Sequence, residues 1–172
     1  MDIKLENILI SSEGHLKFCD FGFTMPGNTF VNKKMGTQGY MAPEIYNAAE
    51  MPCKAQTTDL FSLGVLFFMM AFGAPPFAEA TMNDGYFSFI KLRPGNRDFF
   101  KFHPHTRQLF RLGLIPEALQ NLLLGLLACD PSKRIQRVQE LKESEFFKES
   151  DQKYLKDLEF GAQKLIKHDV MV

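Results

Sequence analysis

The chain has no excess charge of either sign, because its 172 residues carry 20 Lys and Arg against 20 Asp and Glu. A neutral chain lacks the basic surface with which proteins bind DNA or RNA, so no nucleic-acid partner is expected. Cysteine is also scarce, and Cys19, Cys53 and Cys129 lie far apart. An odd number of cysteines, scattered along the chain, argues against a disulfide scaffold and fits a reducing compartment. We therefore expect a cytoplasmic location, with the nucleus as the alternative.

Segments that would direct the chain to a membrane are equally scarce. No basic stretch followed by an apolar one opens the sequence, so a secretory signal is not expected. One uncharged stretch covers residues 60–78, but Pro75 and Pro76 end any helix there and leave too few residues to span a bilayer comfortably. Residues 60–72 are apolar all round, which predicts a helix buried on every side and no membrane span.

What the sequence does contain is typical of a globular domain, with 45% apolar and 23% charged residues. Residues 8–10 and 16–18 read as two strands around a turn at 12–14. Residues 20–44 are polar and rich in glycine, and we expect a long ordered loop there. Loops of that length in a compact domain are usually functional.

Helical patterns dominate from residue 57 onward. Thr57 or Thr58 is the expected N-cap of the apolar helix. Shorter helices are expected over 86–92 and 99–102, and a longer one over 117–128. Asp130 followed by Pro131 predicts the start of a further helix. Residues 151–172 form a charged tail with apolar residues at helical spacing, so we expect one domain over 1–150 and a helical tail over 151–172.

Three short clusters share one chemistry. Residues 2–7 supply a carboxylate, an ammonium and an amide; Asp20-Phe21-Gly22 supplies a second carboxylate; Ala42-Pro43-Glu44 closes the long loop. Together with Gly36-Thr37 before the third cluster and Asp130-Pro131-Ser132-Lys133-Arg134 near the end, this order resembles the C-terminal lobe of a eukaryotic serine/threonine protein kinase, over residues 2–147. The fold implied is mainly α with a small β-hairpin, one lobe of an α+β parent fold.

The resemblance implies transfer of the γ-phosphate of ATP to Ser or Thr of a protein substrate. Asp2 then accepts or orients the substrate hydroxyl proton, and Lys4 places its ammonium on the transferring phosphate. Asn7 and Asp20 are the expected ligands of Mg²⁺, which prefers hard oxygen donors. ATP and Mg²⁺ are the cofactors implied. In the family, a lysine and a threonine at the positions of Lys4 and Thr37 are typical of kinases specific for serine and threonine.

Other positions of the family pattern are expected to support these. Gly22 gives the backbone after Asp20 freedom to move. Gly36 and Thr37 shape the peptide pocket. Two further interactions are implied, an ion pair between Glu44 and Arg134 and hydrogen bonds from Asp59 to backbone amides of the catalytic loop.

The sequence also departs from the family pattern. Met1 precedes Asp2 where the family has His-Arg, and no glycine-rich lid over ATP, strand lysine or partner glutamate occurs in the 172 residues. We therefore expect these residues alone to have weak or no kinase activity, as part of a longer kinase whose upper lobe comes from an upstream segment or a partner chain. The alternative is a non-catalytic kinase-like module that binds proteins.

Overall fold

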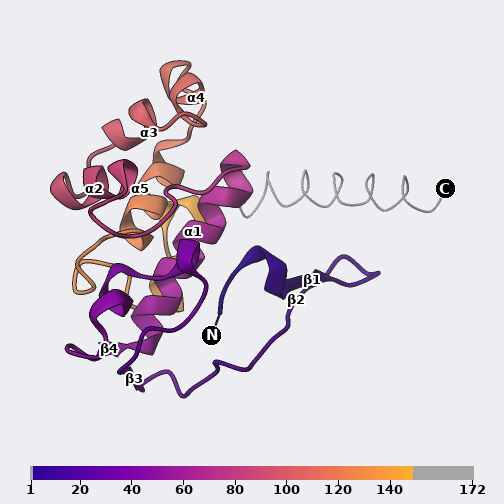
Figure 1. Ribbon diagram of the computed structural model, residues 1–172. Coiled ribbons are helices and arrows are strands. Elements are labelled where there is room, and N and C mark those ends of the chain that lie inside the picture. Colours follow the sequence, from indigo (N-terminus) through magenta and orange to yellow (C-terminus); the bar gives the residue numbers. More distant parts are fainter. Residues whose placement is uncertain (1, 149–172) are drawn as a thin grey trace.

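A single long helix organises the computed structural model, which describes residues 2–148 (Figure 1). Helix α1, Ala55–Phe72, runs through the middle, and the shorter helices gather along one side of it. The small β elements lie toward the other end, and the first hairpin stands apart from the helices (Figure 1). The mainly helical character expected from the sequence is confirmed.

The N-terminal hairpin matches its prediction. After the 3₁₀ turn η1, Leu5–Asn7, strand β1, Ile8–Ile10, pairs antiparallel with β2, Leu16–Phe18. Gly14 makes the turn with a φ of 81°, a backbone conformation that favours glycine. Within residues 2–148 the apolar side chains of this hairpin stay largely uncovered; Leu9, Ile10 and Leu16 are all exposed.

The expected loop over 20–44 contains more structure than its sequence indicates. Strand β3, Phe30–Val31, pairs antiparallel with β4, Cys53–Lys54, just before α1. Two 3₁₀ helices follow β3, η2 at Gln38–Tyr40 and η3 at Pro43–Asn47. Strands of two residues have no alternating pattern long enough to recognise in a sequence, which is why this second sheet was missed.

The expected start of the central helix was wrong. Helix α1 begins at Ala55 with Lys54 as its N-cap. Thr57 and Thr58 lie inside the first turn, where their hydroxyls donate to the carbonyls of Lys54 at 2.9 Å and Ala55 at 2.7 Å. Threonine hydroxyls can satisfy such carbonyls from within a helix as readily as they cap one, so the residue type alone did not fix the boundary.

The expectation that this helix is buried on every side was also wrong, because Met70 is 59% exposed. In the part of the chain that is described, α1 is the one helix long and apolar enough to cross a membrane, and half of its residues are buried in the fold. Its buried apolar residues belong to the hydrophobic core of the fold.

The shorter helices partly follow the expected pattern. Helix α2, Gly85–Leu92, is capped by Asp84, whose side chain accepts hydrogen bonds from the amides of Tyr86 and Phe87. Helix α3, Asp98–Phe102, also lies where it was expected, whereas α4, Arg107–Arg111, was not anticipated. Helix α5 covers Glu117–Leu126 and directly follows Pro116.

The helix expected to begin at Asp130 and Pro131 was wrong. The Asp130 carboxylate accepts hydrogen bonds from both the amide and the hydroxyl of Ser132, at 2.9 and 2.7 Å, which makes a turn. The next helix, α6, begins only at Val138 and ends at Lys142. The boundary drawn at residue 150 and the tail over 151–172 lie outside the described residues.

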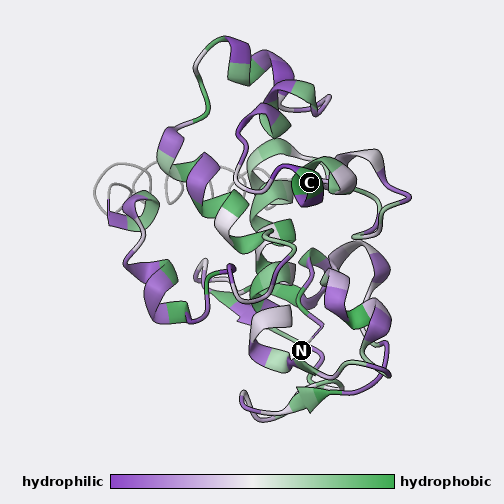
Figure 2. Ribbon diagram, turned by 90° about the vertical axis from the view of Figure 1, so that its left-hand side faces the viewer, coloured by the Kyte–Doolittle hydropathy of each residue, from purple (hydrophilic) through white to green (hydrophobic). Residues whose placement is uncertain are grey.

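The core forms where α1 meets the helices beside it. Gly64 lies so close to α5 that a Cβ on it would come within 2.7 Å of the Leu126 Cβ, which shows how tightly the two helices pack. Figure 2 shows apolar residues concentrated along this central helix and polar residues on the outer ones. The fully buried large side chains include Phe61, Phe68, Phe77, Phe87, Phe99, Phe100, Leu123 and Leu127.

Candidate active site

The structure brings Asp2, Lys4 and Thr37 into one hydrogen-bonded cluster. The Lys4 Nζ lies 2.7 Å from Asp2 Oδ2 and donates to the Thr37 hydroxyl at 2.9 Å. Thr37 in turn donates to both Asp2 carboxylate oxygens, through its amide to Oδ1 at 3.0 Å and its hydroxyl to Oδ2 at 2.9 Å. Residues 35 positions apart thus hold one carboxylate in a fixed orientation.

Electrostatics keep this cluster charged. Burial raises the pKa of the Asp2 carboxyl, but the hydrogen bonds from Lys4 and Thr37 outweigh it, so this pKa lies below its ordinary value. The hydrogen bond to Asp2 raises the pKa of Lys4, and the nearby carboxylates of Glu6 and Asp20 add to the effect. At neutral pH the cluster is therefore a carboxylate held by an ammonium.

Glycine is required next to this cluster. Gly36 has a φ of 105°, and a Cβ at this position would lie 3.4 Å from the Met41 side chain and 3.8 Å from Asp2 Oδ1. Asp59 lines a small cavity of about 30 Å³ that Asp2 and Gly36 also line. Burial raises the pKa of the Asp59 carboxyl.

Asn7 and Asp20 are neighbours across the first hairpin. The amide of Cys19 donates to the Asn7 carbonyl at 2.9 Å, which places Asp20 directly after the residue paired with Asn7. The Asn7 side-chain amide donates to the Asp2 carbonyl at 2.9 Å, so Asn7 ties the hairpin to the cluster. Asp20 has a φ of 60° and accepts a hydrogen bond from the Gly22 amide at 3.1 Å. Its carboxylate is exposed at the end of β2.

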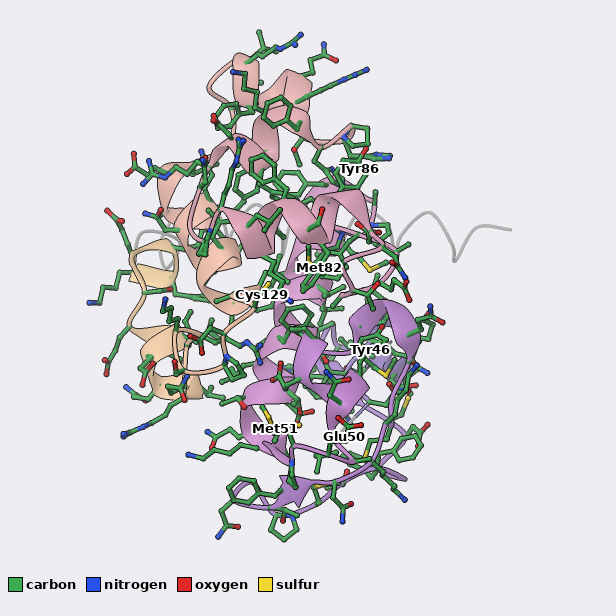
Figure 3. All side chains as sticks on the ribbon, turned by 60° about the vertical axis from the view of Figure 1, so that its left-hand side comes forward. Tyr46, Glu50, Met51, Met82, Tyr86 and Cys129 are labelled. Atoms are coloured by element: carbon green, nitrogen blue, oxygen red, sulfur yellow. The ribbon has the colours of Figure 1, made fainter. Side chains whose placement is uncertain are left out.

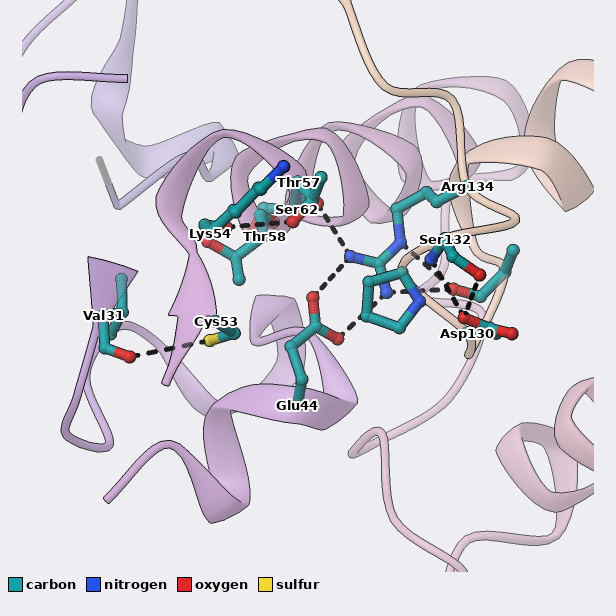
Figure 4. Close-up of polar contacts among 12 residues, drawn as sticks. Val31, Glu44, Cys53, Lys54, Thr57, Thr58, Ser62, Asp130, Ser132 and Arg134 are labelled. Carbon is teal, nitrogen blue, oxygen red and sulfur yellow. Dashed lines mark hydrogen bonds and ion pairs between the residues drawn. The ribbon is translucent and has the colours of Figure 1, made fainter. Parts of the chain in front are cut away.

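A buried arginine holds the end of the long loop in place. The Arg134 Nη1 and Nη2 donate to the two oxygens of Glu44 at 2.6 and 3.0 Å (Figure 4). The same guanidinium donates to the carbonyls of Thr57 and Ala128 and lies over the Phe61 ring. The ion pair implied between Glu44 and Arg134 is therefore present.

Sequence reasoning assigned no role to two residues of this region, Tyr40 and Ser62. The Tyr40 hydroxyl accepts from the Leu5 amide and donates to Glu6, both at 3.4 Å, and the Tyr40 carbonyl accepts from the Ser62 hydroxyl at 2.8 Å. Tyr40 thereby connects the segment around Asp2 to α1. The signals were available: Tyr40 directly follows the Gly36–Gly39 stretch, and Ser62 is the one polar side chain in the apolar run of residues 60–72.

Comparison with known proteins decides the family. The description "Protein kinase domain" matches residues 1–147. The chain belongs to the protein kinase family. The predicted resemblance to serine/threonine protein kinases is confirmed by the relatives, since "Serine/threonine-protein kinase YPK2/YKR2" of Saccharomyces cerevisiae is 33% identical over 159 residues, 90% of this chain and 21% of its own.

Other relatives of this kinase domain come from distant organisms. "Protein kinase 3" of Dictyostelium discoideum is 34% identical over 83% of this chain and 15% of its own length. "Ribosomal protein S6 kinase alpha-4" of Mus musculus is 37% identical over 87% of this chain and 19% of its own. The chain thus spans about a fifth of the length of such relatives.

Proposed function

We propose that this chain is the lower lobe of a protein kinase domain that transfers the γ-phosphate of ATP to Ser or Thr of protein substrates, in the cytoplasm. The observation that supports this most directly is the cluster of Asp2, Lys4 and Thr37. A carboxylate and an ammonium held 2.7 Å apart suit phosphoryl transfer to a hydroxyl, because one can orient the nucleophile and the other can neutralise charge on the phosphate.

In this proposal Asp2 orients the hydroxyl of the substrate and accepts its proton as the phosphate is transferred. Its low pKa makes it a weak base, so its main contribution is to fix the hydroxyl in line with the phosphate. Lys4 stays bonded to Asp2 and directs its charge toward the transferring phosphate. Thr37 holds both groups, and Gly36 leaves room for the substrate backbone beside them.

Asn7 and Asp20 are the residues that would hold Mg²⁺. They fit this role, since an amide oxygen and an exposed carboxylate at the mouth of one hairpin are hard oxygen donors. Residues 2–148 contain no group of three His, Cys, Asp or Glu side chains that could hold a metal without further ligands. Mg²⁺ takes one or two protein ligands and completes its shell with water and phosphate oxygens. When bound, Mg²⁺ neutralises the charge of the phosphates.

The 172 residues alone should transfer phosphate weakly, since they contain no glycine-rich lid or strand lysine to hold ATP. Catalysis is therefore best tested in a chimera that joins the chain to the segment preceding the matched region of the mouse relative. We expect the chimera to phosphorylate a serine peptide, and Asp2→Asn to lower kcat by about 10²–10⁴-fold. Glu13→Gln, an exposed carboxylate of the hairpin turn, is the matched control and should leave kcat unchanged.

The alternative function is that of a non-catalytic kinase-like module. Titration of the isolated chain with Mg-ATP, followed by thermal unfolding, separates the two. A catalytic lobe should be stabilised at high nucleotide concentration, and Asp20→Asn should remove the effect while Glu13→Gln keeps it. An inactive chimera, together with an isolated chain that nucleotide does not stabilise, would leave the binding module as the function.

A further inference from the structure

Basic residues are concentrated in one region of this neutral chain. Between residues 85 and 116 there are six Lys and Arg but one acidic side chain, Asp98. Arg97 is paired with Glu117. The other five form no ion pair with any of residues 2–148; they are Lys91, Arg93, Lys101, Arg107 and Arg111. This concentration of unpaired cations produces a positive field over α2, α3 and α4.

A groove opens within this positive region. It has a volume of about 370 Å³ and is lined by Gly85, Ser88, Phe89, Leu92, Arg93 and Phe102. We call it the α2–α3 groove. Its wall is aromatic, because the rings of Phe89 and Phe102 pack with their centroids 5.6 Å apart. Leu92 is 70% exposed and Phe102 55% exposed, so apolar surface faces solvent at this point.

Cations border the aromatic wall on two sides. The Arg93 guanidinium lies 5.1 Å from the centroid of the Phe89 ring, and the Lys101 Nζ lies 5.7 Å from that of Phe102. Lys91 continues the positive edge into a second groove of about 320 Å³, which Lys133 also lines. Cys129, labelled in Figure 3, lines the same groove. Asp130 is the one carboxylate among the residues that line these two grooves. Its Oδ1 accepts hydrogen bonds from the amide and the hydroxyl of Ser132.

We propose that the α2–α3 groove binds an acidic segment of a partner protein. An aromatic or aliphatic side chain of that segment fills the groove, and flanking carboxylates lie against Arg93 and Lys101. Charge complementarity favours an acidic partner, and the exposed rings beside Arg93 and Lys101 favour one that also presents an apolar side chain. The groove lies across the helical body from the β1–β2 hairpin (Figure 1), so this binding does not depend on the proposed phosphotransfer.

The test is fluorescence anisotropy with the full chain and a fluorescein-labelled peptide in which glutamates flank one phenylalanine. We expect saturable binding that weakens as ionic strength rises. The variant with Arg93→Glu and Lys101→Glu should raise Kd about tenfold or more. Leu92→Ser should also raise Kd, since it removes apolar contact without changing charge. All three positions lie on the protein surface, so thermal unfolding should be unchanged.

The matched control is Lys142→Glu with Lys148→Glu, which makes the same change of charge on exposed residues away from the groove. It should change Kd less than about twofold. An equal rise in Kd for the two double variants would overturn the proposal, because loss of any two surface cations would then weaken peptide binding to the same extent. So would binding to vesicles of phosphatidylserine in place of the peptide, or self-association of the chain that Arg93→Glu and Lys101→Glu abolish.

Discussion

Arg134 binds both carboxylate oxygens of Glu44 from 90 residues further along the chain. The Arg134 side chain is fully buried and that of Glu44 nearly so, and every guanidinium nitrogen also donates to a backbone carbonyl, at Thr57 or Ala128. The pair therefore joins three parts of the fold: the end of the loop after Thr37, the first turn of α1 and the segment after α5. Removing one partner leaves the other charge buried without compensation.

Arg134→Ala should lower the free energy of unfolding by about 3–5 kcal/mol, as measured by urea denaturation. Arg134→Lys should lose most of the same free energy, because an ammonium cannot make the two parallel bonds to Glu44. The control is Arg137→Ala, whose side chain is 77% exposed and which should change stability by less than about 0.5 kcal/mol. An equal effect of Arg134→Ala and Arg137→Ala would show that the buried pair adds nothing to stability.

Thr37→Val should reduce the kcat of the chimera by about 10²-fold, because it removes the hydroxyl that orients Asp2 and Lys4. The pH profile provides a second readout. Thr37 helps to lower the pKa of Asp2, so its loss should raise that pKa and move the acid limb of kcat to higher pH. Thr37→Ser keeps the hydroxyl and should keep both rate and profile. A rate loss with an unmoved acid limb would mean that Thr37 acts on folding alone.

The sequence predicted the elements that local patterns define. The hairpin, two short runs rich in apolar residues around a glycine turn, was found, and so was α2. The residues around Asp2 and Asp20 were predicted as site residues because the order of the clusters is specific to one family. The contact between Thr37 and Asp2 could not be derived from spacing, since it depends on the path of the loop between them.

The errors share a different cause. Thr57, Thr58 and Asp130 are residue types that cap helices, but each satisfies a backbone or side-chain group locally in another way. Tertiary packing decides between such alternatives, and a single sequence does not contain it. The second sheet and the role of Tyr40 likewise depend on contacts between segments that are distant in the sequence.

Gly64→Ala should destabilise the domain by about 1–3 kcal/mol, because the new Cβ would lie 2.7 Å from Leu126 Cβ and 3.2 Å from Leu127 Cδ2. The backbones of α1 and α5 would have to separate. Gly85→Ala is the matched control: it lies in helix α2 with no atom within 4 Å of the added Cβ, so it should be neutral or slightly stabilising. Thermal unfolding of the two variants measures the difference, and equal melting temperatures would contradict close packing at Gly64.

His103 should make the stability of the domain depend on pH below neutrality. Its side chain is buried, and because a carbonyl can only accept, its Nε2–H donates to the Pro75 carbonyl at 3.2 Å. Nδ1 is also buried and has no hydrogen-bond partner among the described residues, so a proton added there would be unsatisfied. Burial lowers the pKa of His103, which means that the unfolded chain takes up a proton at a higher pH than the folded one.

The sign of the effect follows from that difference. As pH falls below about 6.5, unfolded His103 is protonated first, so the free energy of unfolding should decrease by up to about 1.4 kcal/mol per pH unit until folded His103 also titrates. His103→Gln should remove this slope. His15→Gln, at a 72% exposed side chain in the hairpin turn, should retain it. Urea denaturation between about pH 7 and pH 5 measures the slope for all three proteins, and a slope that survives His103→Gln would assign the pH dependence to other groups.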